Sequence, residues 1–266
     1  MKRILSALVL IPVVLGIVQY GSLELFSILV LGAVVAGWFE YSRMLNAMGT
    51  PGFHKLGLAL CVLLTLCFYI NGFYLVWLAV APLVLLLHAL TQGPILKNNL
   101  DQTGYTFLGV GYVAGLMSFF ILIRALDPGH FMIYFLFLVI WGSDTAAYYV
   151  GRSIGKSRLA PEISPGKTVE GSLGGLLGGV LGALIAKYGF WHELALNHCL
   201  IMALFCGIIG QFGDLVESMF KRAAGVKDSG TLIPGHGGVL DRLDSLMFAG
   251  PAFYCYEILI RNPLPV

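Results

Sequence analysis

Acidic side chains within long apolar stretches are the first residues of this sequence that suggest chemistry. Asp144 follows Trp141-Gly142-Ser143 in one such stretch, and further acids stand near the ends of two later stretches: Asp214, Glu217, Asp241 and Asp244. Helical spacing gives two polar faces, one with Asp214, Glu217, Ser218 and Lys221 and one with Asp241, Asp244 and Ser245. Charged groups at membrane depth are costly and usually mark a function.

The polar segment 221–242 joins the two helices that carry the later acids, so their ends can converge. Convergent carboxylates suit a hard cation such as Mg²⁺, which takes oxygen ligands and keeps waters for substrate phosphates. The alternative is that these acids form structural ion pairs with Lys or Arg. We favour the metal interpretation for Asp214 and Asp241, whereas Glu217 has Lys221 one turn away and suits an ion pair.

The segment 221–242 also has the composition of a phosphate-binding loop. It combines four basic residues, Lys221, Arg222, Lys227 and Arg242, with five glycines. Glycines let a backbone approach a ligand, and basic side chains neutralise phosphate. The helix that starts near Asp241 is expected to add N-terminal amides to this site. Together with the acids, the segment predicts a polyphosphate–metal site.

A second polar segment, 151–170, has a similar character. It carries several basic residues and the sequence Ser164-Pro165-Gly166-Lys167-Thr168. Such a segment beside a membrane helix can be only a topology signal. Its density of Ser, Gly, Lys and Thr favours a second wall of the phosphate site.

The composition shows what kind of chain must position these residues. Among the 266 residues, 58% are hydrophobic and 11% are charged, against about 45–50% and about 25% in soluble proteins. This excludes a soluble globular protein, and the shortage of charge excludes a disordered one. A net charge of +2 excludes a general polyanion binder, so no nucleic-acid partner is expected.

A helical membrane span requires about 20 mostly apolar residues. Nine such stretches predict an all-α polytopic membrane protein with about nine transmembrane helices, at 4–20, 22–39, 56–71, 73–93, 105–126, 130–150, 171–189, 198–220 and 243–260. The third and fourth stretches are the weakest, because they are short and are joined only by Asn71-Gly72. The seventh is rich in glycine, which favours close helix packing over a direct role in binding.

The distribution of basic residues predicts the orientation. With the N-terminus in the cytoplasm and alternating spans, the cytoplasmic segments hold 13 Lys and Arg residues and the external segments hold 3. This is a strong positive-inside bias. It predicts a cytoplasmic N-terminus, an external C-terminus, and both polar segments on the cytoplasmic side.

The domain organisation expected from this pattern is a single integral membrane domain, 1–266. Residues 1–140 are mostly apolar spans with short connections. Residues 141–266 form the half that carries the candidate site, with cytoplasmic loops 151–170 and 221–242.

Two long motifs lie in that second half. One reads Ser218-x-Phe220-Lys221-Arg222-x4-Lys227-Asp228-x-Gly230-x2-Ile233-Pro234-x-His236-Gly237-Gly238-Val239-x-Asp241-Arg242-Leu243-Asp244. The other runs from Asp144-x-Ala146-Ala147-Tyr148 to Ser164-Pro165-x-Lys167-Thr168-x-Glu170-Gly171. Both resemble the signatures of the phosphatidate cytidylyltransferases, also called CDP-diacylglycerol synthases. One departure is Gly166, a position that is often basic in that family.

The resemblance implies a magnesium-dependent reaction in which CTP and phosphatidic acid give CDP-diacylglycerol and pyrophosphate, a step of phospholipid biosynthesis. It also implies an all-helical membrane fold and a homodimer. Together with the charge distribution, we expect an integral protein of the inner (plasma) membrane whose active site faces the cytoplasm. Composition and spacing alone identify neither the base nor the lipid.

The resemblance and the placement of the residues together imply site roles. The expected metal ligands are Asp214 and Asp241, with room for a second cation. The expected catalytic residues are Asp144, Lys221, Arg222, Lys227, Asp228, His236, Arg242 and Asp244. His236 either contacts a phosphate or orders the loop. The expected substrate-binding residues are Lys167, Thr168, Ser218, Gly237 and Gly238.

Two other functions are compatible with parts of this pattern. A CTP-dependent kinase of a polyprenol or another lipid would use a similar site but transfer the γ-phosphoryl group. A cation-coupled transporter would place acids throughout the membrane within repeated halves. The clustering of acids with basic loops and the motif around His236 favour the cytidylyltransferase.

Overall fold

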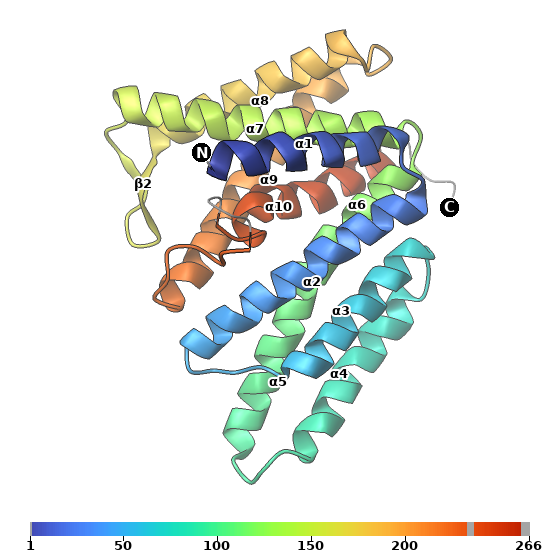
Figure 1. Cartoon of the computed structure of the whole chain (residues 1–266). Coiled ribbons are helices and arrows are strands. Elements are labelled where there is room, and N and C mark those ends of the chain that lie inside the picture. Colours follow the sequence, from blue (N-terminus) through green and yellow to red (C-terminus); the bar gives the residue numbers. More distant parts are fainter. Residues whose placement is uncertain (1, 233–236, 262–266) are drawn as a thin grey trace. The chain divides into compact units, whose positions relative to one another are not determined.

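The described part of the protein is helical, with one small β-hairpin (Figure 1). A computed structural model describes residues 2–232 and 237–261. Its elements are α1 (Lys2–Tyr20), α2 (Leu23–Ala47), α3 (His54–Tyr69), α4 (Tyr74–Leu90), α5 (Leu96–Val110), the π-helix η1 (Gly111–Gly115), α6 (Leu116–Ala125), α7 (Gly129–Ile154), β1 (Arg158–Ala160), β2 (Ser164–Thr168), α8 (Val169–Gly189), α9 (Leu196–Ala223), α10 (Leu240–Tyr256) and the π-helix η2 (Glu257–Arg261).

Every stretch predicted as a membrane span contains a helix in the described part of the chain. Among the residues that the structure describes, six helices are long and apolar enough to cross a bilayer: Leu23–Ala47, Leu96–Ala125, Gly129–Ile154, Val169–Gly189, Leu196–Ala223 and Leu240–Arg261. The chain is therefore a polytopic helical membrane protein. Helices α3 and α4 have 16 and 17 residues and are shorter than each of these six helices.

The helices run past the predicted spans at several ends. Helix α2 continues to Ala47, whereas the apolar stretch ends at residue 39, and α5 begins at Leu96 rather than near residue 105. Hydropathy falls where polar residues begin, but the backbone hydrogen bonds of a helix continue through them. The segment 151–170 also contains the unpredicted antiparallel hairpin β1–β2, in which Arg158 is opposite Thr168.

Two compact units make up the chain. The first contains residues 1–122 and 220–242, and the second contains residues 123–219 and 243–266. Helices α9 and α10 contribute residues to both units.

Close contacts between aromatic rings and glycines shape the first unit. The fully buried ring of Tyr41 on α2 occupies the space that a side chain at Gly109 would fill. Its hydroxyl donates to the carbonyl oxygen of Tyr105 at 3.0 Å. Trp38 blocks Gly57 on α3 in the same way. Glycines at these positions let α2 pack against both α3 and α5.

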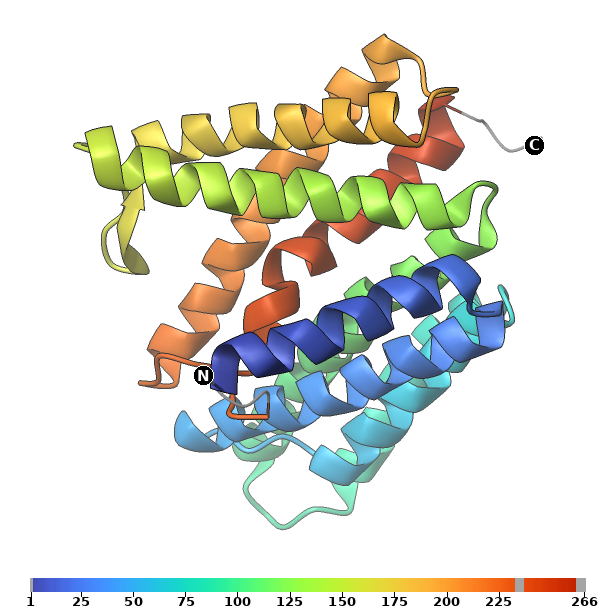
Figure 2. The ribbon, with the colours of Figure 1, turned by 45° about the horizontal axis from the view of Figure 1, so that its top comes forward.

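Glycines also bring α7 and α8 together in the second unit, where Figures 1 and 2 show the two helices side by side along their length. A Cβ atom at Gly178 would overlap the carbonyl oxygen of Gly142 and the side chain of Ala146. One at Gly182 would overlap the carbonyl oxygen of Leu138. The glycine-rich span thus has the packing role expected from its sequence.

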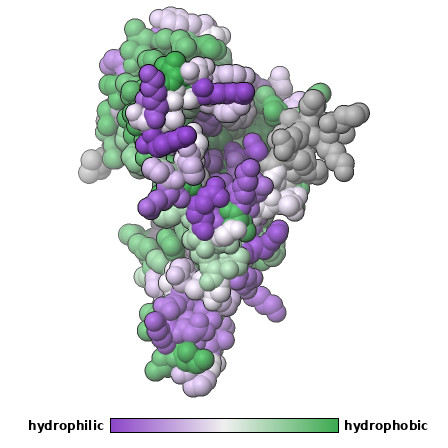
Figure 3. All heavy atoms as spheres, turned by 90° about the vertical axis from the view of Figure 1, so that its left-hand side faces the viewer, coloured by the Kyte–Doolittle hydropathy of each residue, from purple (hydrophilic) through white to green (hydrophobic). Residues whose placement is uncertain are grey.

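Each unit exposes large apolar side chains on at least one of its helices. Large apolar side chains are exposed along α4 and α8, including Leu75, Leu83, Leu173 and Leu181. Figure 3 faces the side of Figure 1 that carries the β1–β2 hairpin, and hydrophilic side chains gather on it. The polar segments lie at helix ends: 151–170 contains the end of α7 and the start of α8, and 221–242 contains the end of α9 and the start of α10.

Candidate active site

Three aspartates from three helices form an acidic cluster in the second unit: Asp144 on α7, Asp214 on α9 and Asp244 on α10. Asp144 and Asp244 each interact electrostatically with Asp214, and with each other. The Lys167 ammonium pairs with Asp214 Oδ2 at 2.7 Å, with 27% and 31% of the two side chains exposed. The structure therefore brings together three of the predicted acids and one predicted substrate-binding lysine.

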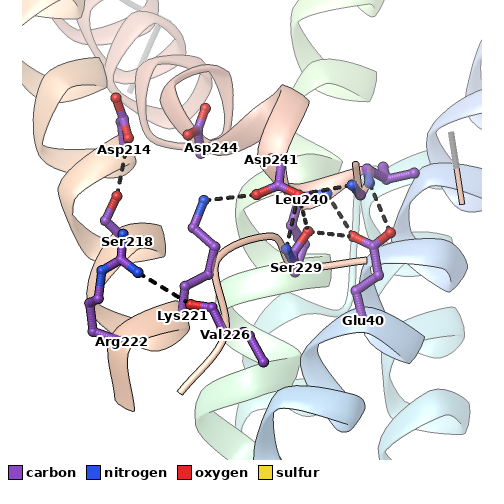
Figure 4. A network of polar contacts seen from close by, with 12 residues as sticks. Glu40, Asp214, Ser218, Lys221, Arg222, Val226, Ser229, Leu240, Asp241 and Asp244 are labelled. Carbon is purple, nitrogen blue, oxygen red and sulfur yellow. Dashed lines mark hydrogen bonds and ion pairs between the residues drawn. The ribbon is translucent and has the colours of Figure 1, made fainter. Parts of the chain in front are cut away.

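Small residues on α9 hold the acidic cluster together. A Cβ atom at Gly213, next to Asp214, would lie 2.5 Å from the backbone carbonyl oxygen of Asp244. Only glycine permits this approach of α9 and α10. Ser218, one turn after Asp214, has its Oγ 3.5 Å from Asp214 Oδ1, the long contact drawn in Figure 4. Glu217 lies fully buried on the same helix.

The hairpin that presents Lys167 is anchored to the start of α8. Glu170 accepts hydrogen bonds from the backbone amides of Lys156 at 3.0 Å and Ser157 at 3.2 Å. Thr168 caps α8 by accepting from the amide of Gly171 at 3.1 Å. Thr168 is buried, so its hydroxyl serves the fold at the position where substrate binding was predicted.

A second set of contacts, the loop network, lies in the first unit and is centred on Asp241. Its Oδ1 accepts from the Lys221 ammonium at 2.7 Å. Its Oδ2 accepts from the Ser229 amide and hydroxyl, both at 2.9 Å, and from the Gly238 amide at 2.8 Å. Only 12% of the Lys221 side chain and 9% of the Asp241 side chain are exposed. These contacts, drawn in Figure 4, tie Asp241 to both described flanks of its loop.

Glu40 on α2 completes the loop network and was not recognised from the sequence. It is 4% exposed, and its two carboxylate oxygens accept from the amides of Val239 and Leu240, each at 2.9 Å. Ser229 Oγ lies 3.0 Å from Glu40 Oε2 (Figure 4). The predicted second span ends at residue 39, one position before this acid. An acid directly after the apolar Trp38-Phe39 was the available signal.

The amides at the start of α10 have a different use from the one predicted. We expected them to bind phosphate, but the amides of Gly238, Val239 and Leu240 donate to the carboxylates of Asp241 and Glu40. Carboxylates are favoured at a helix N-terminus for the same electrostatic reason as phosphates. The basic side chains are therefore the groups of this loop that remain suited to phosphate.

The other predicted residues of segment 221–242 include exposed charged side chains and less exposed glycines. Arg222, Lys227, Asp228 and Arg242 are exposed, and Arg222 also donates to the carbonyl oxygen of Val226 at 3.4 Å. Gly237 has a positive φ of 85°, which favours glycine, and Gly238 is buried against Ser229 and Glu40. His236 lies outside the described residues.

The donor atoms of the described residues bear on the predicted metal site. Within residues 2–232 and 237–261, no three or more His, Cys, Asp or Glu side chains form a group that could hold a metal ion. The acidic cluster nevertheless consists of carboxylates, the donors that Mg²⁺ prefers. Asp214 also already holds a cationic group, the Lys167 ammonium. The cluster thus offers donor atoms of the type that a hard cation takes, although the described side chains do not form a metal-binding group. Asp241 has its oxygens engaged by the loop network.

Apolar helices with acids and basic loops at their ends define a polytopic membrane protein built to handle anionic groups. Comparison with known proteins makes this specific: the chain belongs to the cytidylyltransferase family, whose pattern matches residues 1–259. The family predicted from the two motifs is therefore confirmed.

Individual relatives are similar over nearly their whole length. The phosphatidate cytidylyltransferase of Bacillus subtilis (strain 168) is 38% identical over 263 residues, which cover 95% of this chain and 96% of that protein. The enzyme of the same name from Haemophilus influenzae is 34% identical, with 97% and 99% covered. The one from Staphylococcus saprophyticus is 35% identical, with 94% and 95% covered.

Proposed function

We propose that the protein is a phosphatidate cytidylyltransferase that converts CTP and phosphatidate into CDP-diacylglycerol and pyrophosphate. The observation that carries this proposal is full-length similarity to several proteins of that name, at 34–38% identity. The acidic cluster and the basic loop support it, because the reaction brings together a triphosphate and a lipid phosphate.

The reaction is an in-line displacement at phosphorus. A phosphatidate oxygen attacks the α-phosphorus of CTP, a new P–O bond forms, and the bond to the β-phosphate oxygen breaks as pyrophosphate leaves. A phosphate monoester is largely ionised near neutral pH, so the attack requires little help from a general base. The work of the protein is positioning and charge neutralisation.

Candidate residues of each unit would take part in this work. Lys227, Arg222 and Arg242 are exposed cations on or beside the loop and suit the triphosphate of CTP. Lys167 holds Asp214 until a substrate phosphate competes for its ammonium. Lys221 is engaged with Asp241 and keeps the base of the loop in place.

Asp214, with Asp144 and Asp244, would hold magnesium. When bound, the metal supplies positive charge that stabilises the oxygens of the transferring phosphoryl group. The metal-ligand role of Asp241 stays a prediction, and its contacts support a role in ordering the loop.

The sidedness proposed for this reaction follows the basic residues. Nine spans, a cytoplasmic N-terminus and an external C-terminus place both polar segments in the cytoplasm, where CTP is made. The positive-inside distribution of Lys and Arg supports this arrangement. The location in the plasma membrane, the single integral domain and the homodimer also remain predictions.

One assay tests the proposal directly. Purified protein is incubated with Mg²⁺, phosphatidate, and CTP labelled at either the α- or the γ-phosphorus. We expect the α-label, and not the γ-label, to appear in a lipid product that migrates as CDP-diacylglycerol. Asp214→Asn provides the inactive control. Transfer of the γ-label to lipid would instead identify a lipid kinase, and the absence of any labelled lipid would refute both reactions.

A further inference from the structure

Glu40 is the one buried acid of the described chain whose carboxylate joins α2 to the polar segment that follows α9. Its contacts lie 189 to 200 residues away in sequence. They reach both described flanks of the loop, because Ser229 precedes residues 233–236 and Val239 and Leu240 follow them. The carboxylate therefore bridges two points that the chain itself connects only through the loop.

The surroundings of Glu40 are shaped to hold its carboxylate. A Cβ atom at Gly230 would lie 2.5 Å from Glu40 Oε1, and one at Gly238 would lie 2.5 Å from Glu40 Oε2. Gly230 and Gly238, two glycines of the long motif, thus leave room for the carboxylate of Glu40, which lies in the first half of the chain. Gly37, one turn before Glu40, would bring a Cβ atom to 3.1 Å from Leu240 Cδ2. The α2 backbone is therefore close to the start of α10.

The chemistry of the site requires a carboxylate rather than any polar group. Val239 and Leu240 present consecutive backbone N–H groups, and each finds one oxygen of Glu40. A glutamine offers one acceptor and one NH₂ group, so either orientation sets an NH₂ group against a backbone N–H. The negative charge also favours the N-terminus of α10.

We propose that Glu40 is a positioning residue for the nucleotide-binding loop, which it fixes at Ser229–Gly230 and at Gly238–Leu240. It acts through the loop network, since the Ser229 hydroxyl lies within 3.0 Å of Glu40 and 2.9 Å of Asp241, which holds Lys221. The basic side chains at Lys227 and Arg242, each two residues from a point that Glu40 contacts, are thereby held in place. This inference rests on the proposed function for the identity of the nucleotide.

The test compares Glu40→Gln with Glu24→Gln, an exposed acid on the same helix. For Glu40→Gln we expect the KM for CTP to rise about tenfold to hundredfold, the range produced by loss of one hydrogen bond to a charged group. The KM for phosphatidate is expected to stay within about twofold, because a uniform structural defect would not select one substrate. Glu40→Asp keeps both acceptor oxygens, so its KM for CTP is expected to lie between the values of Glu24→Gln and Glu40→Gln.

A second measurement does not depend on activity. Hydrogen exchange of the backbone amides of residues 237–240 is expected to accelerate about tenfold or more in Glu40→Gln and to stay unchanged in Glu24→Gln. Unchanged exchange, or equal increases in KM for both substrates, overturns the positioning role. An inactive wild-type protein with accelerated exchange in the variant would refute the proposed reaction but not the contact.

Gly230→Ala disturbs the same contact from the side of the loop. Combined with Glu40→Ala, it separates loss of this contact from general misfolding. The added methyl group displaces the Glu40 carboxylate, so we expect the KM for CTP to rise as it does in Glu40→Gln. In the Glu40→Ala background the space is free, so Gly230→Ala is expected to add no further loss. Additive losses in the double variant would show that the two residues act separately.

Discussion

Two lysine–aspartate pairs in the candidate site differ most in how far they are buried. Lys167–Asp214 and Lys221–Asp241 have the same N–O distance of 2.7 Å, but their side-chain exposures are 27%/31% and 12%/9%. Partly exposed pairs contribute at most about 1 kcal/mol. Breaking a buried pair from one side costs about 3 kcal/mol, because a charge is left behind. The two aspartates should therefore respond differently to the same substitution.

We predict that Asp214→Asn loses activity with little loss of stability, whereas Asp241→Asn loses both. Removing one electrostatic group from a reaction site costs about 100-fold or more in kcat. For Asp241→Asn, a neutral amide would face the Lys221 ammonium, and a loss of about 3 kcal/mol corresponds to roughly 6–12 °C in Tm. Activity with CTP and thermal unfolding in detergent measure the two effects.

Asp101→Asn is the control for both variants, because Asp101 is exposed on α5. It is expected to match the wild-type protein in both measurements. An unchanged thermal midpoint for Asp241→Asn together with a lowered midpoint for Asp214→Asn would contradict this assignment. The structural role would then belong to Asp214.

The sequence identified the acids of the second unit but not what holds the loop. Asp144, Asp214 and Asp244 stand out because charges are rare in apolar stretches. Glu40 escaped because it falls just after the predicted end of a span. Its partners, about 190–200 residues further on, follow from tertiary packing and not from any local pattern. The partners of Asp241 were missed for the same reason, since residue type does not distinguish a metal ligand from a capping carboxylate.

At the scale of the elements, the packing of α7 against α8 depends on backbone contact. At Gly178 a methyl group would overlap the main chain of α7, whereas at Gly32 on α2 nothing lies within 4 Å of the Cβ position. Replacing glycine by alanine within a helix normally stabilises it by up to about 1 kcal/mol. Forcing an extra methyl group into a packed contact costs about 1–3 kcal/mol.

We predict opposite signs for these two substitutions. Gly178→Ala is expected to lower the thermal midpoint in detergent, because it pushes α8 away from α7, the helix that carries Asp144. Gly32→Ala is expected to leave the midpoint unchanged or raise it. A midpoint for Gly178→Ala at or above that of the wild-type protein would mean that α7 and α8 do not pack as the structure describes.

Hydropathy predicted where the helices are but not where they end. The position of each helix follows from a long run of apolar residues, which can be read directly from the sequence. The polar ends of α2 and α5 carry no such signal, because a solvated helix turn and a loop have similar composition. The hairpin β1–β2 was missed because its strands have only three and five residues and follow no apolar alternation.

At the scale of the whole molecule, sidedness connects the charge pattern to the substrate. CTP is a cytosolic anion that does not cross a bilayer unaided, so the basic segments must face the cytoplasm if the proposed reaction is correct. Ser157 and Thr231 are exposed on these segments, and Glu193 is exposed in the connection between α8 and α9. Ser229 would be unsuitable as a probe because it is 4% exposed.

Single cysteines at these exposed positions, in a variant without the five native cysteines, test the topology. We predict that Ser157→Cys and Thr231→Cys resist an impermeant thiol reagent in intact cells and react in inverted vesicles. Glu193→Cys is expected to show the reverse pattern. Labelling of both polar segments from outside intact cells would contradict the proposed orientation and the reaction built on it.

The long separation between Glu40 and its partners has a consequence for how the protein is made. Ser229 follows Glu40 by 189 residues, and a ribosome adds about 5–20 residues each second. The carboxylate of a newly inserted α2 therefore waits about 10–40 s for the groups that will bind it. During that interval the first helices must tolerate an acid without its final partners, and α10 cannot be capped until nearly the whole chain exists. Because of the order of synthesis, the hydrogen bonds between Glu40 and the loop are among the last contacts to form.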